Sequence, residues 1–438
     1  MRRIILFLLV CICGSLASCA TQPVGGDKPP AGWTAENVEF LGYTIMNEHP
    51  AFKIAPMKSG DRWYIIGGHY NIPGWSLVDV TDPRKPFVAK FIPGPANTST
   101  NQVDFADNIL LASLVRPGAR EDAGMSVNKP YQAGVVLIDL KDPLNPKEVG
   151  RWHTDKPKGR GTHRNLWPGG KYAYLAADME GYDGDILIIL DVSNPAKPVE
   201  AGRWWVPGQH VAGGEKPQKD PNVNLHSPQL VDGNLLYLAY GDAGMVILDI
   251  SDVKKPRLVS QTHFTRGHRF DVHTIMKDSK RPLVYVNSEN VTYNCKGPLD
   301  HATIVDISNP AKPVPLSRYP TPIPAAGLPY TSFCDKGGRF GPHNMSQLQH
   351  NPLVQKQGNL SYLTWFNGGL RIYDVSNSRL PREVGYFMAG PPEKQYLKAY
   401  GPYVRMEDVV ADTRGYLYVT GGAQQGLYVL RYTGPVKN

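Results

Sequence analysis

One motif recurs six times along this chain: an apolar strand ends in aspartate, a short polar turn follows, and a second strand begins. The turn holds Ser, Thr or Lys followed by Asp or Asn, and usually a proline. Self-similarity of this kind is typical of architectures in which each repeat buries its apolar faces against its neighbours. The six copies are SLVDVTDPRKP (76–86), VVLIDLKDPLNP (135–146), LIILDVSNPAKP (187–198), MVILDISDVKKP (245–256), ATIVDISNPAKP (302–313) and LRIYDVSNSRLP (370–381).

The ends of the chain predict how the repeats close. A seventh strand, GLYVLRYTG (426–434), starts like the others but lacks the aspartate turn, because the chain ends there. The strand after each turn has a shared pattern, as in NPKEVGRW and KPVEAGRW, and NVEFLGYTI (37–45) carries the same pattern near the N-terminus. We therefore expect an all-β, seven-bladed β-propeller over residues 37–438, in which an N-terminal strand completes the last blade and leaves no open sheet edge.

The repeated strands also carry a family resemblance. The runs IVDIS, VILDIS and LIILDVS, with their Asn/Asp-Pro turns, resemble the LVIVD-repeat propeller proteins of bacteria and archaea, many of them predicted lipoproteins. The resemblance extends over nearly everything from Val38 to Tyr432, and it implies the fold but no particular activity. The repeated aspartates are expected to accept hydrogen bonds within their turns, with calcium binding as the alternative. They are Asp79, Asp139, Asp191, Asp249, Asp306 and Asp374.

Residues 1–19 predict an export signal, with a basic start, an apolar run and small residues before Cys19. The ending LASC resembles a bacterial lipobox, whose cysteine becomes the lipidated first residue. Ala20 follows in place of aspartate, which is compatible with sorting to the outer membrane. We expect an outer-membrane lipoprotein that faces the periplasm or the cell surface and is anchored to the membrane through lipidated Cys19. The alternative is a plain secretory signal cut near Ala17. Residues 20–36 are expected to be a linker.

The charge pattern argues against a nucleic-acid partner. The formal net charge of +8 falls to +6 when Arg2 and Arg3 leave with the signal, and the remaining basic residues are interspersed with acidic ones. A nucleic-acid-binding surface would need a basic cluster, and none stands out.

Cys295 and Cys334 remain after the signal and the anchor are set aside. An even pair in an oxidising compartment predicts a disulfide between them. Two thiolate ligands of a metal are the alternative, although no CxxC spacing surrounds them.

Histidine recurs at one position of the repeat. Counting back from the second strand of each blade gives the start of the innermost strand, which opens beside the central axis onto the face that carries most of the long loops. Four of the seven positions hold histidine although the chain has only 12, and a fifth holds glutamate. The residues are His163, His226, His273, His343 and Glu407, with Asn101 and Lys53 in the first two blades.

Imidazoles that converge from separate rigid strands form a preorganised pocket for a transition metal. We therefore expect His163, His226, His273 and His343 to bind Cu, Fe, Zn or Mn. The alternative is that each histidine satisfies neighbouring backbone groups in a narrow channel.

Further candidates lie beside this ring. Arg164 follows His163, His268 and Arg269 come shortly before His273, and Arg405 precedes Glu407. Glu407 or His268 could act on a substrate, and the arginines could clamp a carboxylate or another anionic group. The alternative is that the arginines neutralise nearby carboxylates.

Three functions are consistent with these residues. The first is a metal-dependent oxidoreductase or lyase acting on a small substrate that could be anionic. The second is a metal-free lyase or isomerase with a histidine base. The third is a non-catalytic protein that holds a partner at the outer membrane through the loop-rich face.

Overall fold

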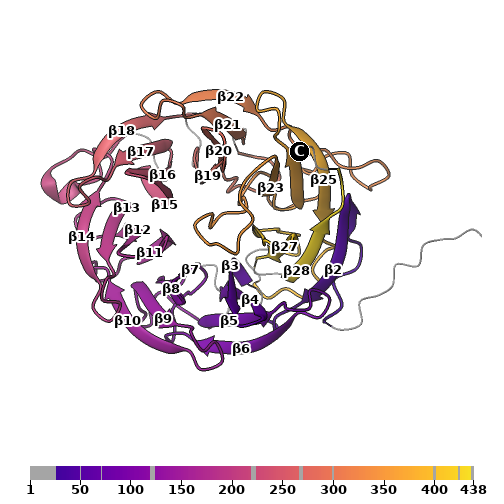
Figure 1. The fold of residues 1–438 in the computed structure, drawn as a ribbon, viewed down its shortest axis with the longest axis horizontal. Coiled ribbons are helices and arrows are strands. Elements are labelled where there is room, and N and C mark those ends of the chain that lie inside the picture. The colour runs from indigo at the N-terminus through magenta and orange to yellow at the C-terminus, as the bar shows by residue number, and fades with distance from the viewer. Residues whose placement is uncertain are drawn as a thin grey trace, which may run out of the picture.

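Seven four-stranded antiparallel sheets surround a central axis (Figure 1). The computed structural model describes residues 26–49, 51–70, 72–118, 124–218, 223–265, 270–297, 300–397, 401–422 and 425–435. The expected all-β, seven-bladed propeller is confirmed. Helical structure in this part of the chain includes the 3-10 turn η1 (Val211–Gly213), and none of the described helices is long and apolar enough to span a lipid bilayer.

Blades 1 to 5 run from the axis outwards in chain order. Blade 1 comprises β3 (Ala51–Ser59), β4 (Arg62–His69), β5 (Gly74–Asp79) and β6 (Phe87–Pro93), and blade 2 comprises β7 (Val103–Ala106), β8 (Ile109–Leu114), β9 (Gly134–Asp139) and β10 (Lys147–His153). Blade 3 comprises β11 (Thr162–Leu166), β12 (Tyr172–Asp178), β13 (Asp185–Asp191) and β14 (Val199–Trp204), and blade 4 comprises β15 (Val223–Asp232), β16 (Leu235–Gly241), β17 (Met245–Asp249) and β18 (Arg257–Thr262). Blade 5 comprises β19 (Thr274–Lys277), β20 (Leu283–Asn287), β21 (Ala302–Asp306) and β22 (Val314–Arg318).

The N-terminal strands complete blade 7 and add an outer strand to blade 6, whose innermost segment is bridged to β23 at Met345. Blade 6 comprises β23 (Leu360–Thr364), β24 (Leu370–Asp374), β25 (Arg382–Met388) and β1 (Thr34–Glu36). Blade 7 comprises β26 (Asp408–Ala411), β27 (Tyr416–Gly421), β28 (Gln425–Tyr432) and β2 (Val38–Thr44).

The second and third strands of each blade form the core. In β12 and β13 almost every residue is buried, because each sheet is covered on both faces by the sheets beside it. Strands buried on both faces are near-continuous apolar runs, which is why the repeated motif contains LIIL and MVIL. The outer strands face solvent on one side and are only partly buried, as in β14 and β18.

The repeated aspartates stabilise their turns as expected. Each carboxylate accepts a hydrogen bond from the backbone N–H two residues further on, at 2.7 to 3.0 Å. Asp and Asn favour such local bonds, which fix the tight reversal between the third and fourth strands. The pairs are Asp79–Thr81, Asp139–Lys141, Asp191–Ser193, Asp249–Ser251, Asp306–Ser308 and Asp374–Ser376.

These turns also join neighbouring blades. A Cβ atom on Gly202 of β14 would lie 2.0 Å from the carbonyl oxygen of Val253, in the turn of the next blade. Where serine replaces glycine at this position, the hydroxyl donates to the turn instead, as Ser260 does to the Pro310 carbonyl at 2.7 Å. The small residue in each GRW or SQT pattern is therefore the place where the next turn packs.

The ring closes where β2 pairs with β28, from Val38 opposite Tyr432 to Thr44 opposite Leu427. This is the closure expected from the N-terminal strand. A buried ion pair adds to it, because Lys53 of β3 donates to Asp408 of β26 at 2.7 Å.

The N-terminal segment extends further onto the ring than expected. Residues 20–36 were predicted to be a linker, but Thr34–Glu36 forms β1 and pairs with the outer strand β25. Asp27 also accepts a hydrogen bond from the backbone of Ile45 at 2.8 Å. In the other blades, the aspartate turn packs against the small residue in the outer strand of the preceding blade. Blade 7 has no aspartate turn, so the connection at Glu36 packs against Gly385 of blade 6 in its place.

Candidate metal centre

Four histidines line one cavity at the axis. His163 lies in β11 and His226 in β15, while His273 immediately precedes β19. His343 lies in the short innermost segment of blade 6, which the bridge between Met345 and Leu363 ties to β23. The cavity has a volume of about 200 Å³. The structure thus brings together the four residues expected to bind metal.

The imidazole rings form a continuous row. The centroids of His163 and His226 lie 4.7 Å apart, those of His226 and His273 3.9 Å apart, and those of His273 and His343 4.7 Å apart. The Nε2 atoms of His163 and His226 face each other at 3.0 Å. Two imidazole nitrogens bound to one metal at about 2 Å each lie roughly 3 Å apart, so this spacing fits a shared ion.

On two of the four rings, backbone and hydroxyl groups hold Nδ1. Nδ1 of His273 lies 3.0 Å from the carbonyl oxygen of His343 and 2.9 Å from the hydroxyl of Thr274. Nδ1 of His343 lies 2.6 Å from the carbonyl oxygen of Glu407. A carbonyl only accepts, so Nδ1 carries the proton on both rings and Nε2 keeps its lone pair. Metal-ligating histidines show this arrangement.

A carboxylate completes the strongest group of ligand atoms. His226, His273 and Glu289 each offer one ligand atom, and these atoms lie within 4.8 Å of one another. Nε2 of His273 lies 3.6 Å from one Glu289 oxygen, and Nε2 of His343 lies 3.9 Å from the other. Arg339 donates to Glu289 at 3.0 Å and fixes its position. Two imidazoles and a carboxylate form a donor set that suits iron, manganese or zinc.

The surroundings keep the imidazoles neutral. Burial lowers the pKa of all four histidines well below the usual value, and the Arg164 guanidinium lowers each of these pKa values further. Neutral imidazole is the form that binds metal, so the site is in the binding-competent protonation state at neutral pH.

Glu407 lies behind the histidines rather than in the cavity. Its carboxylate contacts Nδ1 of His343 at 3.1 Å, and Arg405 pairs with its other oxygen. Burial raises the pKa of Glu407 to about 7 despite Arg405 and Arg339. The position suits a group that orients His343.

The remaining candidates divide between the cavity and the part of the chain not described. Arg164 and Arg405 line the cavity, together with Arg160 and Arg339. His268 and Arg269 lie outside the described residues.

Sequence reasoning missed Glu289 and Arg339. Both lie in long loops that have no counterpart in the repeat, so counting positions within the blade cannot find them. The one available signal was the place of Glu289, two residues after β20 and at the same end of the sheet as the histidines.

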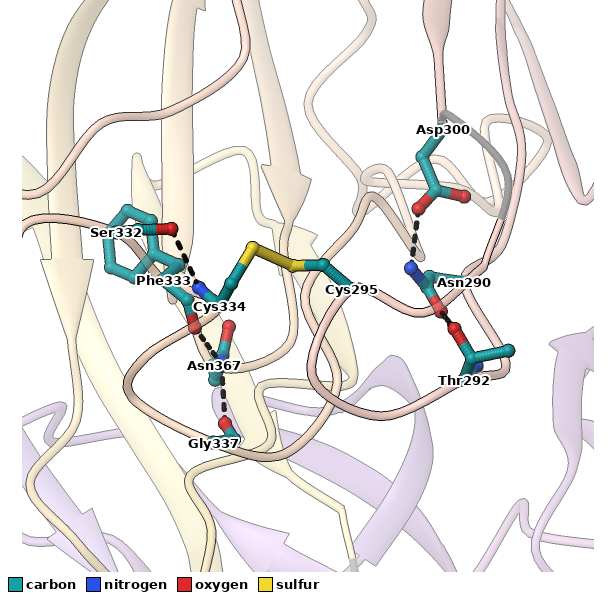
Figure 2. Close-up of a disulfide and its surroundings, with 9 residues drawn as sticks. All are labelled: Asn290, Thr292, Cys295, Asp300, Ser332, Phe333, Cys334, Gly337 and Asn367. Atoms are coloured by element: carbon teal, nitrogen blue, oxygen red, sulfur yellow. Dashed lines mark hydrogen bonds between the residues drawn. A yellow bond between two sulfur atoms is a disulfide. The ribbon is translucent and has the colours of Figure 1, made fainter.

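The expected disulfide joins these two loops. Cys295 follows Glu289 by six residues and bonds to Cys334, which precedes Arg339 by five (Figure 2). Asn367 supports the Cys334 loop by donating to the carbonyl oxygens of Phe333 and Gly337 at 2.9 and 2.6 Å. The disulfide therefore links the two loops that carry Glu289 and Arg339.

The fold and its axial cavity define the chain as a β-propeller. Residues 160–205, 230–263, 301–321 and 354–389 match the LVIVD repeat family. The chain thus contains four matches to the LVIVD repeat within a seven-bladed β-propeller, and the resemblance expected from its turns is confirmed. A search of curated proteins gave no match.

Solved structures with similar folds have little sequence in common with this chain. A protein from Lactobacillus plantarum matches with a TM-score of 0.53 and 11% identity, over 89% of this chain and 89% of that one. The periplasmic gluconolactonase PpgL of Pseudomonas aeruginosa matches with a TM-score of 0.52 and 13% identity, over 84% of this chain and 99% of that one. At such identities the likeness shows the fold alone.

Proposed function

We propose that this protein is a metal-dependent enzyme, an oxidoreductase or lyase that acts on a small molecule in the axial cavity. His226, His273 and Glu289 would hold a transition metal ion, with His163 and His343 on either side. The observation that carries the proposal is the orientation of the rings: backbone carbonyls hold Nδ1 of His273 and His343, and Nε2 of both faces Glu289.

The packing of the site supports a ligand rather than a purely structural cluster. Histidines that serve only to satisfy backbone groups need one bond each. In His273 and His343 those bonds use Nδ1, and Nε2 of both rings faces Glu289. The Nε2 atoms of His163 and His226 lie within hydrogen-bond distance of each other. A bound ion supplies Lewis-acid or redox chemistry. The chain's own residues supply the orientation of the ligands, through Arg339 on Glu289 and Glu407 on His343.

Acid–base catalysis without metal is a second candidate. It is favoured by the Glu407–His343 contact, because a carboxyl with a pKa of about 7 beside an imidazole can hold or release a proton near neutral pH. In that case His343 would transfer the proton and Glu407 would act through it. A non-catalytic protein that binds a partner is the remaining alternative.

Metal analysis of the purified full-length protein separates these functions. We expect a stoichiometric transition metal that is lost in both His226→Ala and His273→Ala variants. His153→Ala is the matched control, because His153 lies exposed on β10 and should leave the metal content unchanged. Wild-type protein that binds no Zn²⁺, Fe²⁺, Mn²⁺ or Cu²⁺ when each is added would contradict the proposal. Turnover by that metal-free protein would then favour acid–base catalysis, and a stable captured partner would favour the binding role.

We also propose that the protein is an exported lipoprotein of the outer membrane, anchored through lipidated Cys19, with its cavity open to the periplasm or the cell surface. The lipobox-like LASC ending and the following Ala20 support this. Radiolabelled palmitate should enter the wild-type protein and not a Cys19→Ser variant. Unlabelled wild-type protein released into the soluble fraction would support the plain secretory signal instead.

A further inference from the structure

Among the residues that the structure describes, four arginines line the cavity, and three of them have a carboxylate partner. Such pairs reduce the cost of burying charge at the axis. The three pairs are Arg160 with Asp185, Arg339 with Glu289, and Arg405 with Glu407.

Arg164 is the exception. It is only 7% exposed, and its guanidinium donates to the neutral side-chain amide of Asn344 at 2.9 Å. No carboxylate lies within ion-pair distance of Arg164 among the residues that the structure describes. Arg164 follows His163 in β11 and lines the cavity. Its charge lowers the pKa of all four histidines, so its guanidinium lies close to the whole row.

A buried guanidinium with one neutral partner has donors to spare. Arginine carries five N–H donors and stays charged at neutral pH. Leaving such a charge unpaired in a protein interior is costly. A metal cation on the neutral histidines would make the cavity still more positive. An anion that enters the cavity would offset both.

We propose that Arg164 binds the carboxylate of a small organic acid and holds it against the histidine row. This inference rests on the proposed function in one respect, because it names the substrate class of the same site. The planar fork of a guanidinium matches the two oxygens of a carboxylate, and the resulting bidentate pair fixes the orientation of the acid.

The rest of the cavity fits the organic part of such a molecule. Phe52, Phe270 and Val291 contribute apolar surface to the wall. Phe52 lies 5.8 Å from the ring of His343, and Phe270 lies 5.9 Å from the ring of His226, both measured between centroids. A volume of about 200 Å³ admits an acid with a short side chain.

Calorimetric titration of the full-length protein with three probes tests the proposal. The probes are propionate, the neutral isostere propionamide and inorganic phosphate, each added to metal-free and to zinc-treated protein. We expect propionate to bind at least about tenfold more tightly than propionamide, and Arg164→Gln to remove about tenfold or more of that affinity. Arg318→Gln is the control, since Arg318 lies exposed on β22 and should bind propionate like the wild type.

Any one of these results would overturn the inference: equal affinity for propionate and propionamide, wild-type propionate affinity in Arg164→Gln, or phosphate binding ten times tighter than propionate. The comparison of propionate with propionamide needs only wild-type protein, so it tests the inference even if the Arg164→Gln variant does not fold. If the protein takes up no metal but still binds propionate through Arg164, the metal proposal fails and the inference about Arg164 is supported. Zinc uptake without propionate binding overturns the inference alone.

Discussion

Replacing both Cys295 and Cys334 with serine removes the covalent tie between the loops that carry Glu289 and Arg339. The disulfide closes a loop of 39 residues in sequence separation. The entropy of closing such a loop in the unfolded chain corresponds to about 4 kcal/mol of stability. We expect the free energy of unfolding to fall by up to this amount. We also expect zinc affinity to fall by about tenfold or more, because Glu289 loses part of its support.

Urea unfolding followed by tryptophan fluorescence measures the stability, and competition with a chromophoric chelator measures the zinc affinity. Wild-type protein that has been reduced and alkylated should behave like the double serine variant. The reasoning is refuted if the variant loses less than about 1 kcal/mol and binds zinc as tightly as the wild type. The hydrogen bond from Asn294 to the Gly338 carbonyl, at 2.9 Å, would then be enough to hold the two loops together.

Two further predictions concern the ring. Gly202→Val should lower the free energy of unfolding by more than about 2 kcal/mol, because the new Cβ meets the Val253 carbonyl, whereas Gly358→Ala has open space and should be nearly neutral in the same urea titration. Lys53→Met should cost about 3–5 kcal/mol by leaving Asp408 buried and unpaired, and adding Asp408→Leu should recover most of the loss. Retention of full stability in Lys53→Met would show that the ion pair does not secure the closure.

The repeat explains why the fold and the histidine row could be predicted from sequence. Because every blade has the same strand order, residues at one repeat position reach the same height and distance from the axis. His163, His226, His273 and His343 therefore converge although up to 180 residues separate them. The aspartate turns were equally accessible, since Asp191 and Ser193 interact within two residues.

The rest of the site depends on contacts that the repeat does not encode. Glu289 and Arg339 lie in loops of different blades, and only the folded ring brings the two side chains to 3.0 Å. The same holds for β1, which finds its partner β25 some 350 residues later because blade 7 leaves room there. The sequence by itself determined the propeller, its closure and the histidine row, since local turns and strand periodicity specify them. Tertiary structure alone decided which carboxylate faces those histidines and which cavity arginine has no acidic partner among the described residues, because long-range packing of the loops sets both.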